Sequence, residues 1–331
     1  MIQKQKFKIL LLIVGSAIFF TLIYKVGSAN IYQYLCLLKW KILFLPLPYA
    51  IVFALDTLGW KYSLKGANVY FRNLFTIRLA GESINMIIPS ANFAGEPLKA
   101  YLLKRHNISM LDGITSVVIS KAIMTISQII FVMLGVGFLL FQLHISGPRL
   151  VSIIVITLLL GIPVILFILF IQKRGIFLSF SKLLRKLGIK IAFVEKNVDR
   201  LIALDKNITQ FYSHNKKNFY LSLIFYFLGW IAGLIEVLLV FYLLNIPINF
   251  LSIYIIESLS TVAKGITSFI PGSMGGQEGG IIMIFLNLKL SASIAITFCI
   301  LRRLRELIWV ALGLVILSKL EWKIAESSTN D

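Results

Sequence analysis

Long apolar runs separated by short polar segments predict a bundle of membrane-spanning helices. About 20 apolar residues are enough for a helix to cross the hydrocarbon core of a bilayer. We therefore expect an all-α polytopic membrane protein, one integral membrane domain over residues 1–331, with about six full transmembrane helices. The predicted spans are about 8–25, 42–60, 113–141, 150–171, 218–244 and 291–319.

Residues 74–105 are apolar but interrupted, and their pattern predicts a helical hairpin that enters and leaves the membrane on one side. A charge at mid-bilayer costs about 2.5–3.5 kcal/mol, so a polar helical face here is expected to line the bundle interior or a wet cavity. The alternative is an Arg78–Glu82 pair near the interface that only stabilises a helix end. Spacings of four, three and four place on that one face Arg78, Glu82, Asn85 and Pro89.

A second interrupted segment, residues 251–289, repeats the plan of the first. In each segment an Ile-Pro step is followed seven residues later by a glutamate, Glu96 or Glu278. A basic residue lies 32 residues after each proline, at Lys121 and at Arg303. Two corresponding helix breaks in a membrane chain are typical of inverted-repeat transporters. We therefore predict two re-entrant hairpins that enter from opposite sides, in repeat halves of about 42–141 and 218–319.

The second segment combines a polar stripe with a glycine-rich turn. Glu257 and Lys264 belong to the stripe, again at helical spacing. Glycines allow tight turns that expose backbone N–H groups, and a helix beginning there presents its positive end to an anion. With Lys121, Lys264 and Arg303 nearby, two such helix starts would suit a phosphate head group. The residues expected to shape the hairpin backbones are Pro89, Gly95, Pro271, Gly272, Gly275 and Gly276.

Glu96 and Glu278 occupy the same two helix starts and admit two interpretations. As caps, their carboxylates would compete with an anionic ligand for the free N–H groups. As protonatable groups, they would charge and discharge as substrate or protons pass. The residues alone leave both interpretations open.

Two further acids and a glycine pair lie inside predicted spans. Asp56 is near the inner end of its span and is expected to be hydrated or paired rather than functional, while Glu236 lies well inside another span. Gly229 and Gly233 form a small-xxx-small pair, which lets a neighbouring helix approach closely.

Composition supports a membrane protein and argues against nucleic acid as a partner. The chain is 58% hydrophobic and 14% charged, with a mean hydropathy of +0.89. Its net charge of +19 comes mostly from lysines and arginines in short segments between apolar runs, as the positive-inside rule requires. Both termini are therefore expected on the cytoplasmic side. Lysines before residues 8–25 also fit a signal peptide, but the longer spans that follow favour a retained helix.

The basic connection at residues 172–217 is also predicted to be cytoplasmic. It holds eleven lysines and arginines interleaved with apolar residues. It would either lie along anionic head groups or serve only to set the topology.

Enzyme, metal and redox signals are weak in this sequence. Cys36 and Cys299 lie far apart in apolar surroundings, and the three histidines are scattered. No cluster has metal-ligand spacing, and no GK[ST] follows the glycine-rich run as a P-loop would require. We expect no metal and no cofactor.

Two motifs and the arginine-bearing last span that follows them resemble the membrane domain of lysylphosphatidylglycerol synthases, a flippase-like family with stand-alone members. The motifs are GESINMIIPSANFAGEPLKAYLL and FIPGSMGGQEGG. The resemblance covers about residues 5–320, and the GES-x-N form looks most like the branch associated with hopanoid biosynthesis. It implies a bacterial inner-membrane protein that moves a lipid between leaflets, with Lys121 standing where arginine is expected. The family pattern falls on Glu82, Asn85, Pro89, Gly95, Glu96, Pro271, Gly272, Gly275, Gly276 and Glu278.

In the fused synthases the lipid is an aminoacylated phosphatidylglycerol made by a soluble C-terminal domain. Because this chain ends at Asp331 without room for that domain, we expect a transporter rather than an enzyme. Its cargo is expected to be a lipid with an anionic or aminoacylated head group. The acidic head group would be attracted by Lys121, Lys264, Arg302 and Arg303, and Glu82, Glu96 and Glu278 would shape or gate the cavity.

Two other classes of function remain open. A membrane enzyme would modify a lipid head group or a polyprenyl carrier, with Glu96 or Glu278 as acid or base. A non-transporting partner would assemble with enzymes of lipid or hopanoid biosynthesis. A homo-oligomer is compatible with any of the three.

Overall fold

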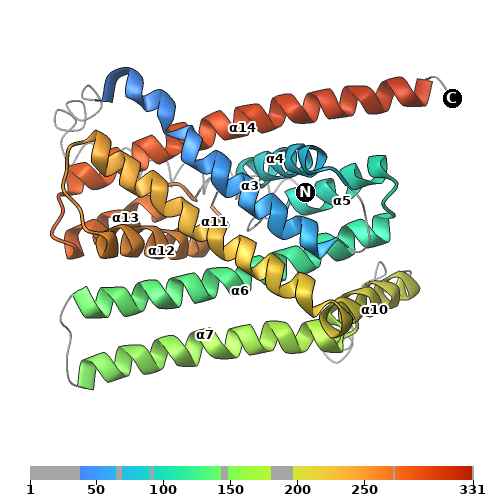
Figure 1. The fold of residues 1–331 in the computed structure, drawn as a ribbon, viewed down its shortest axis with the longest axis horizontal. Coiled ribbons are helices and arrows are strands. Elements are labelled where there is room, and N and C mark those ends of the chain that lie inside the picture. Colours follow the sequence, from blue (N-terminus) through green and yellow to red (C-terminus); the bar gives the residue numbers. More distant parts are fainter. Residues whose placement is uncertain are drawn as a thin grey trace, which may run out of the picture.

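The chain folds into a bundle in which every described element is helical (Figure 1). A computed structural model describes residues 38–64, 69–88, 90, 93–142, 148–179, 197–270 and 273–329, without the side chains of 148–156, 158, 173 and 321–329. The elements are η1 (Lys39–Phe44), α3 (Pro46–Ser63), α4 (Phe71–Ile87), α5 (Gly95–Leu103), η2 (Lys104–His106), α6 (Met110–Gln142), α7 (Pro148–Arg174), α10 (Val198–His214), α11 (Lys216–Leu243), α12 (Phe250–Ile266), α13 (Gly276–Asn287) and α14 (Ala292–Thr329).

Helices α3 and α11 run side by side through the centre of the bundle (Figure 1). Small residues make the close approach possible, as the glycine pair in α11 predicted. A Cβ at Gly229 would lie 2.6 Å from Asp56 of α3, and one at Gly233 would lie 3.0 Å from Glu257 of α12. Each glycine therefore faces a different neighbour, and both neighbours carry a buried acid.

Two short helix pairs lie toward opposite ends of the bundle, α4 with α5 at one end and α12 with α13 at the other (Figure 1). Each first helix also packs on the long helix of the other half of the chain: α4 lies against α14, and α12 lies against α6. Serine and glycine allow these contacts, since a Cβ at Gly135 of α6 would collide with Ser258 of α12. The two halves thus exchange contacts in a reciprocal way.

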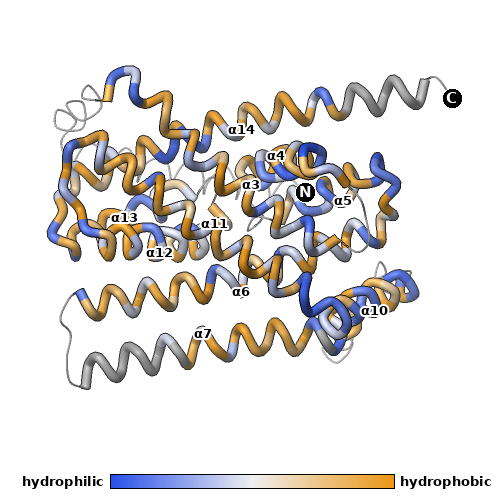
Figure 2. Tube along the Cα trace, in the orientation of Figure 1, coloured by the Kyte–Doolittle hydropathy of each residue, from blue (hydrophilic) through white to orange (hydrophobic). Residues whose placement is uncertain are grey.

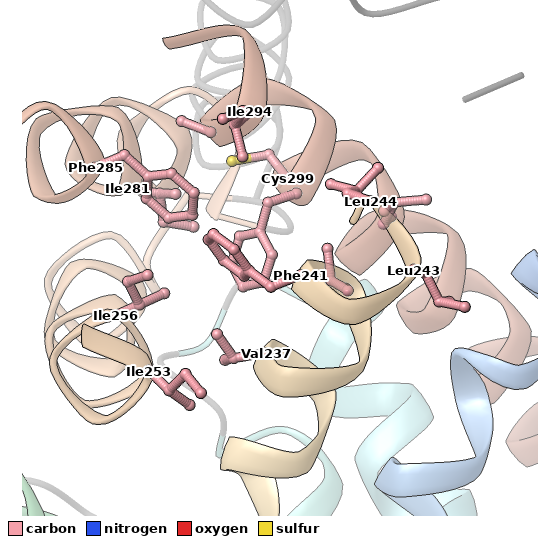
Figure 3. Close-up of a cluster of buried hydrophobic side chains, with 14 of the residues drawn as sticks. Val237, Phe241, Leu243, Leu244, Ile253, Ile256, Ile281, Phe285, Ile294 and Cys299 are labelled. Atoms are coloured by element: carbon pink, nitrogen blue, oxygen red, sulfur yellow. The ribbon is translucent and has the colours of Figure 1, made fainter. Parts of the chain in front are cut away.

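Each helix pair has its own apolar core. The core beside α12 and α13 centres on Phe285, whose ring lies 5.8 Å from that of Phe241 and 5.5 Å from that of Phe298, centroid to centroid. Figure 3 shows this packing, with Phe241, Phe285 and Cys299 converging between α11, α13 and α14. The core beside α4 and α5 includes Trp60, whose indole Nε1 donates a hydrogen bond to Ser116 Oγ at 3.3 Å. Such interdigitated packing holds helices together where lipid offers no hydrophobic driving force.

Three of the described helices are long and apolar enough to cross a membrane. They are Lys39–Ser63, Met110–Gln142 and Lys216–Leu243, which coincide with three of the six predicted spans; orange residues cover much of their length in Figure 2. In α7 the apolar stretch among residues with described side chains is Leu159–Gln172. Helix α14 is longer, but Arg302, Arg303, Arg305 and Glu306 interrupt its apolar character. The predicted span at 8–25 lies outside the described residues.

The basic connection contains the amphipathic helix α10, which packs on α6 and α7 (Figure 1). Its apolar side includes Ile208 and Phe211, both buried against α6 and α11. Asp205 accepts hydrogen bonds from the backbone N–H groups of Phe177 and Leu178, at 3.0 and 2.8 Å. The apolar side of α10 therefore contacts protein, and the head-group contact considered for this connection stays a prediction.

At Gly95 the backbones of α4 and α5 lie too close together for a Cβ atom, and this contact supplies a test of the helix pair. A Cβ there would lie 1.9 Å from the carbonyl oxygen of Gly81, which is backbone and cannot rotate away. We predict that Gly95→Ala destabilises the folded protein by about 1–3 kcal/mol, as overpacking does, and lowers the thermal unfolding midpoint of detergent-solubilised protein. The matched control is Gly279→Ala, because a Cβ at Gly279 meets nothing within 4 Å. Equal midpoints for the two variants would contradict the packing described here.

Candidate functional site

A cavity of about 340 Å³ lies between the two halves of the chain. Its walls come from α3, α4, α6, α11, α12, α13 and α14, so both helix pairs contribute. The volume is within the range of small-molecule pockets, about 300–1,000 Å³. Polar and charged side chains gather on either side of it in two groups, which we call the α4 cluster and the α14 cluster.

The α4 cluster consists of Asp56, Arg78, Glu82, Asn85, Glu96, Lys99 and Lys121. Arg78 is 3% exposed and donates from Nη2 to Asp56 Oδ2 at 2.8 Å, whereas its distance to Glu82 Oε1 is 3.9 Å. The principal partner of Arg78 is therefore on α3, and the Arg78–Glu82 pair considered from the sequence is secondary. Arg78 lies in the interior, as its position on the polar face predicted.

Lys99 and Asn85 join the two helices of the first pair. Lys99 Nζ donates to Glu82 Oε1 at 3.0 Å and to Glu96 Oε1 at 2.9 Å. Asn85 Oδ1 accepts the backbone N–H of Gly95 at 2.7 Å, and its Nδ2 donates to Glu96 Oε1 at 3.3 Å. Asn85 thereby satisfies one of the free N–H groups at the start of α5, a task usually done by a local cap. These bonds fix the position of Glu96 relative to α4.

The α14 cluster consists of Glu236, Glu257, Lys264, Glu278, Arg302, Arg303, Arg305 and Glu306. Four of its members, Arg302, Arg303, Arg305 and Glu306, lie within five residues of one another on α14. The three arginines are paired with acids from three other helices, α11, α12 and α13. Arg305 Nη1 donates to Glu236 Oε2 of α11 at 2.6 Å, and Arg302 Nη2 donates to Glu257 of α12.

Lys264 connects the cluster to the second helix pair. Its Nζ donates to Glu306 Oε1 at 2.7 Å, and Glu306 Oε2 accepts from Arg303 Nη1 at 3.0 Å. The side chain of Lys264 is 31% exposed and faces the cavity.

The corresponding residues of the two sequence segments make corresponding contacts. Glu96 lies 3.5 Å from Lys121 Nζ, and Glu278 accepts from Arg303 Nε at 2.9 Å. In both cases the glutamate is in the first turn of the second short helix and the cation is on the following long helix. The side-chain partners seen for the two carboxylates are lysine, arginine and, for Glu96, Asn85. The structure thus places both glutamates in ion pairs.

The turn before α13 has the backbone that its glycines predicted. Gly275 has φ +79°, a left-handed conformation that L-residues with side chains rarely adopt. Gly276 begins α13 against Thr267, with no room for a Cβ. The predictions for Pro89, Pro271 and Gly272 concern positions outside the described residues.

Several buried polar atoms at the cavity have no hydrogen-bond partner among the described residues. They include Ser260 Oγ and Gln277 Oε1, on side chains that are 0% and 4% exposed, and Trp230 Nε1. Buried polar groups are normally satisfied by protein or by ordered water, and each exception calls for an explanation. Among the described residues, His, Cys, Asp and Glu form no group of three placed to hold a metal ion.

Sequence reasoning identified one side of most ion pairs and missed several of their partners. It did not include Asp56, Lys99, Glu236, Arg305 or Glu306 among the site residues, and all five are less than 9% exposed. A signal was available for Lys99 and Glu306, which follow Glu96 and Arg303 by three residues and so share their helical faces. For Asp56 and Glu236 the signal was an acid inside a span, which is costly unless it is paired.

The Asp56–Arg78 contact predicts a specific effect on stability. Removing one partner of a buried pair leaves an uncompensated charge and costs about 3–5 kcal/mol. We therefore expect Asp56→Asn to lower the thermal unfolding midpoint strongly, and Asp56→Asn with Arg78→Gln to recover much of that loss. The control is Asp199→Asn, at an exposed position in α10. If the single variant unfolds at the control's midpoint, or if the double variant is worse than the single, Asp56 does not compensate Arg78.

Comparisons with known proteins place the chain in a family of membrane proteins. The family model described as "Lysylphosphatidylglycerol synthase TM region" matches residues 8–313. A UPF0104 membrane protein of Methanothermobacter thermautotrophicus is 25% identical over 264 residues, 77% of each chain. UPF0104 membrane protein PH1989 of Pyrococcus horikoshii is 22% identical over 318 residues, 90% of this chain and 92% of that protein. No solved structure matches. Since the family model covers well over half of the sequence, the chain belongs to the lysylphosphatidylglycerol synthase transmembrane-region family.

Proposed function

We propose that this protein moves a polar lipid between the two leaflets of a membrane, with the lipid's head group crossing through the cavity between the two halves of the chain. The observation that carries the proposal is the cavity itself, an interior space lined by ion-paired side chains from both halves and by residues whose polar atoms have no partner in the described part of the chain. Charged side chains inside a membrane are expensive and mark substrate or ion pathways. The membership of a lipid-related family agrees with a lipid as the substrate.

We further propose that the two halves form an inverted repeat, which would support transport. The pairs Glu96–Lys121 and Glu278–Arg303 have the same spacing in sequence and the same placement on helices. The two helix pairs lie toward opposite ends of the bundle (Figure 1). In inverted-repeat transporters the substrate site lies near the midplane, at the interface between the repeats. On this proposal α4–α5 and α12–α13 are the two re-entrant hairpins, entering from opposite faces.

The contacts of the cavity suggest how a head group would be held. Lys121 and Lys264 are the most accessible of its paired cations, with side chains 22% and 31% exposed. A phosphate oxygen can take the place of a carboxylate oxygen at a lysine, because both are strong acceptors for an ammonium group. Binding would then exchange one ion pair for another and leave no buried charge alone. The acyl chains would stay among the lipids.

Apolar side chains are exposed at the tips of both helix pairs, where a lipid tail would pass. They are Ile87, Ile88 and Phe93 in the first pair and Ile266 and Phe269 in the second, each at least 40% exposed. Phe93 also packs beneath Lys121, whose Nζ lies 5.5 Å from the ring centroid. The tips therefore combine an apolar outer surface with a cation on the cavity side.

The site is proposed to carry out transport without chemical change of the lipid. The two alternatives are an enzyme that modifies the lipid and an assembly partner of lipid-biosynthesis enzymes. Leaflet exchange and lipid mass, measured together, distinguish transport from both. The proposed location is a bacterial inner membrane, with both termini on the cytoplasmic side.

The proposal predicts leaflet exchange in vesicles that contain the purified protein. Fluorescent phospholipids should move between leaflets faster than in protein-free vesicles. We expect Glu96→Gln with Glu278→Gln to lower the rate about tenfold or more, since each substitution removes one carboxylate from the ion pairs of Lys121 or Arg303 and a change of about 1.4 kcal/mol at a site already represents a factor of ten. Mass spectrometry of the recovered lipid should show no change in mass.

The matched control for that experiment is Asp199→Asn, which makes the same chemical change at an exposed site. Folding of each variant is checked by gel filtration and thermal unfolding. Exchange by the wild type that equals protein-free vesicles, across anionic, zwitterionic and aminoacylated lipids, would refute transport. An altered lipid mass would favour the enzyme, and unchanged exchange in the folded double variant would remove the glutamates from the mechanism.

A further inference from the structure

Among the described residues, the α4 cluster and the α14 cluster contain fourteen ionisable side chains, whose formal charges balance. The α4 cluster has three carboxylates and three cations, and the α14 cluster has four of each. Each of the seven carboxylates lies within 4.0 Å of a lysine or arginine nitrogen, and each of the seven cations lies within 4.0 Å of a carboxylate oxygen. With every group in its paired, ionised form, the interior has no net charge.

This balance bears on what the cavity can accept. Charges interact far more strongly in the protein interior than in water, so one surplus charge there changes the electrostatic energy of every charged group in the two clusters. A cargo with a net charge would unbalance a neutral site and would have to be accompanied by a compensating ion. A cargo without net charge meets no such penalty. The overall charge of +19 does not change this, because it arises mostly outside the apolar runs.

An accessible acid and an accessible cation occupy matching positions on the two sides of the cavity, and Lys121 adds a second accessible cation on the side of the acid. Seven residues before each proline, the first half carries Glu82 and the second half carries Lys264. Both line the cavity, and their side chains are 22% and 31% exposed, so each offers free surface to a ligand. Glu82 comes from α4 and Lys264 from α12, the first helices of the two pairs. The repeated plan of the chain thus supplies opposite charges at matching positions.

The cavity wall also contains side chains whose polar atoms have no hydrogen-bond partner among the described residues. Ser260 Oγ lies on α12, like Lys264, and Gln277 Oε1 lies at the start of α13, and neither finds a partner among the described residues. Both side chains are more than nine-tenths buried and line the cavity. A hydroxyl can donate or accept a hydrogen bond and an amide oxygen accepts one, so these two unpartnered groups suit a ligand that carries both donors and acceptors.

We infer that the cavity selects a zwitterionic lipid head group, one with a phosphate toward Lys264 and an ammonium toward Glu82 and no net charge. This rests on the proposed function and narrows its substrate class. It favours phosphoethanolamine-type head groups, or a phosphatidylglycerol aminoacylated with a single amine, over a net-anionic phosphatidylglycerol. The specificity then comes from the balance of charges in the site, because a lipid with a net charge of either sign leaves one charged group in the site unpaired.

The test measures binding, which does not require transport. Full-length protein in detergent is titrated with lipids of identical acyl chains, and the bound fraction is read by native mass spectrometry. Phosphatidylethanolamine carries no net charge, phosphatidylglycerol carries one negative charge, and lysyl-phosphatidylglycerol carries one positive charge. We expect the wild type to bind phosphatidylethanolamine about tenfold or more tightly than either charged lipid.

Two single variants and their combination make the inference specific. Glu82→Gln leaves the network one charge positive and should shift the preference by about tenfold toward phosphatidylglycerol. Lys264→Gln leaves it one charge negative and should shift the preference toward lysyl-phosphatidylglycerol by a similar factor. The double variant, Glu82→Gln with Lys264→Gln, is neutral again and should return to the uncharged lipid, with weaker binding. Compensation between two helices of different halves is not expected from a structural role alone.

Each result decides the question. Wild-type binding of phosphatidylglycerol equal to or tighter than phosphatidylethanolamine, or absence of any lipid preference, overturns the inference. So do two single variants that shift the preference in the same direction. If the charge-dependent preference is found but vesicles show no leaflet exchange, the transport proposal alone fails. If exchange occurs and favours the net-anionic lipid, transport stands and this inference falls.

Discussion

The cost of placing charge inside an apolar bundle governs this structure. Arg78, Glu236, Glu257 and Arg305 are each at most 6% exposed, in helices that otherwise present apolar residues. An unpaired charge in such surroundings is costly enough to unfold a protein, so each buried group requires a partner at hydrogen-bond distance. That requirement determines which helices must be neighbours: α3 beside α4, α11 and α12 beside α14. The apolar cores then fill the remaining space, as the packing in Figure 3 illustrates.

Pairing across the two halves is what leaves a cavity at the centre. Helix α4 packs on α14 and α12 packs on α6, so each helix pair is supported by the other half of the chain. The ion pairs occupy the two sides of the space between them, and Ser260 and Gln277 belong to its wall, with side-chain polar atoms that have no partner among the described residues. A site held together in this way can exchange a carboxylate for a phosphate at one lysine without losing its other contacts. This is the physical basis for proposing that head groups pass through it.

Much of the architecture could be predicted from the sequence, because membrane burial imposes simple rules on composition. The spans at 42–60, 113–141 and 218–244 coincide with helices long and apolar enough to cross a membrane, and the polar face containing Arg78 is interior, as expected. The family resemblance read from the two motifs is confirmed by the match over residues 8–313. The full count of six spans and the re-entrant character of the hairpins remain predictions.

The partners of the charged residues were harder to predict from the sequence. Arg78 pairs with Asp56 on another helix rather than with Glu82 one turn away, and only the packing of α3 on α4 determines that choice. The matched pairs at Glu96 and Glu278 were foreseen as equivalent positions, but their engagement by Lys121 and Arg303 required the three-dimensional arrangement.

The central claim is that a lipid head group occupies the cavity between the two halves. The most direct measurement is a cryo-electron microscopy structure of the protein in lipid nanodiscs. We expect head-group density between α4 and α12, with phosphate density within hydrogen-bond distance of Lys121 or Lys264 and lipid tails emerging past Phe93 or Phe269. Lipid density confined to the outer surface of the bundle, around a cavity closed by its own side chains, would contradict it.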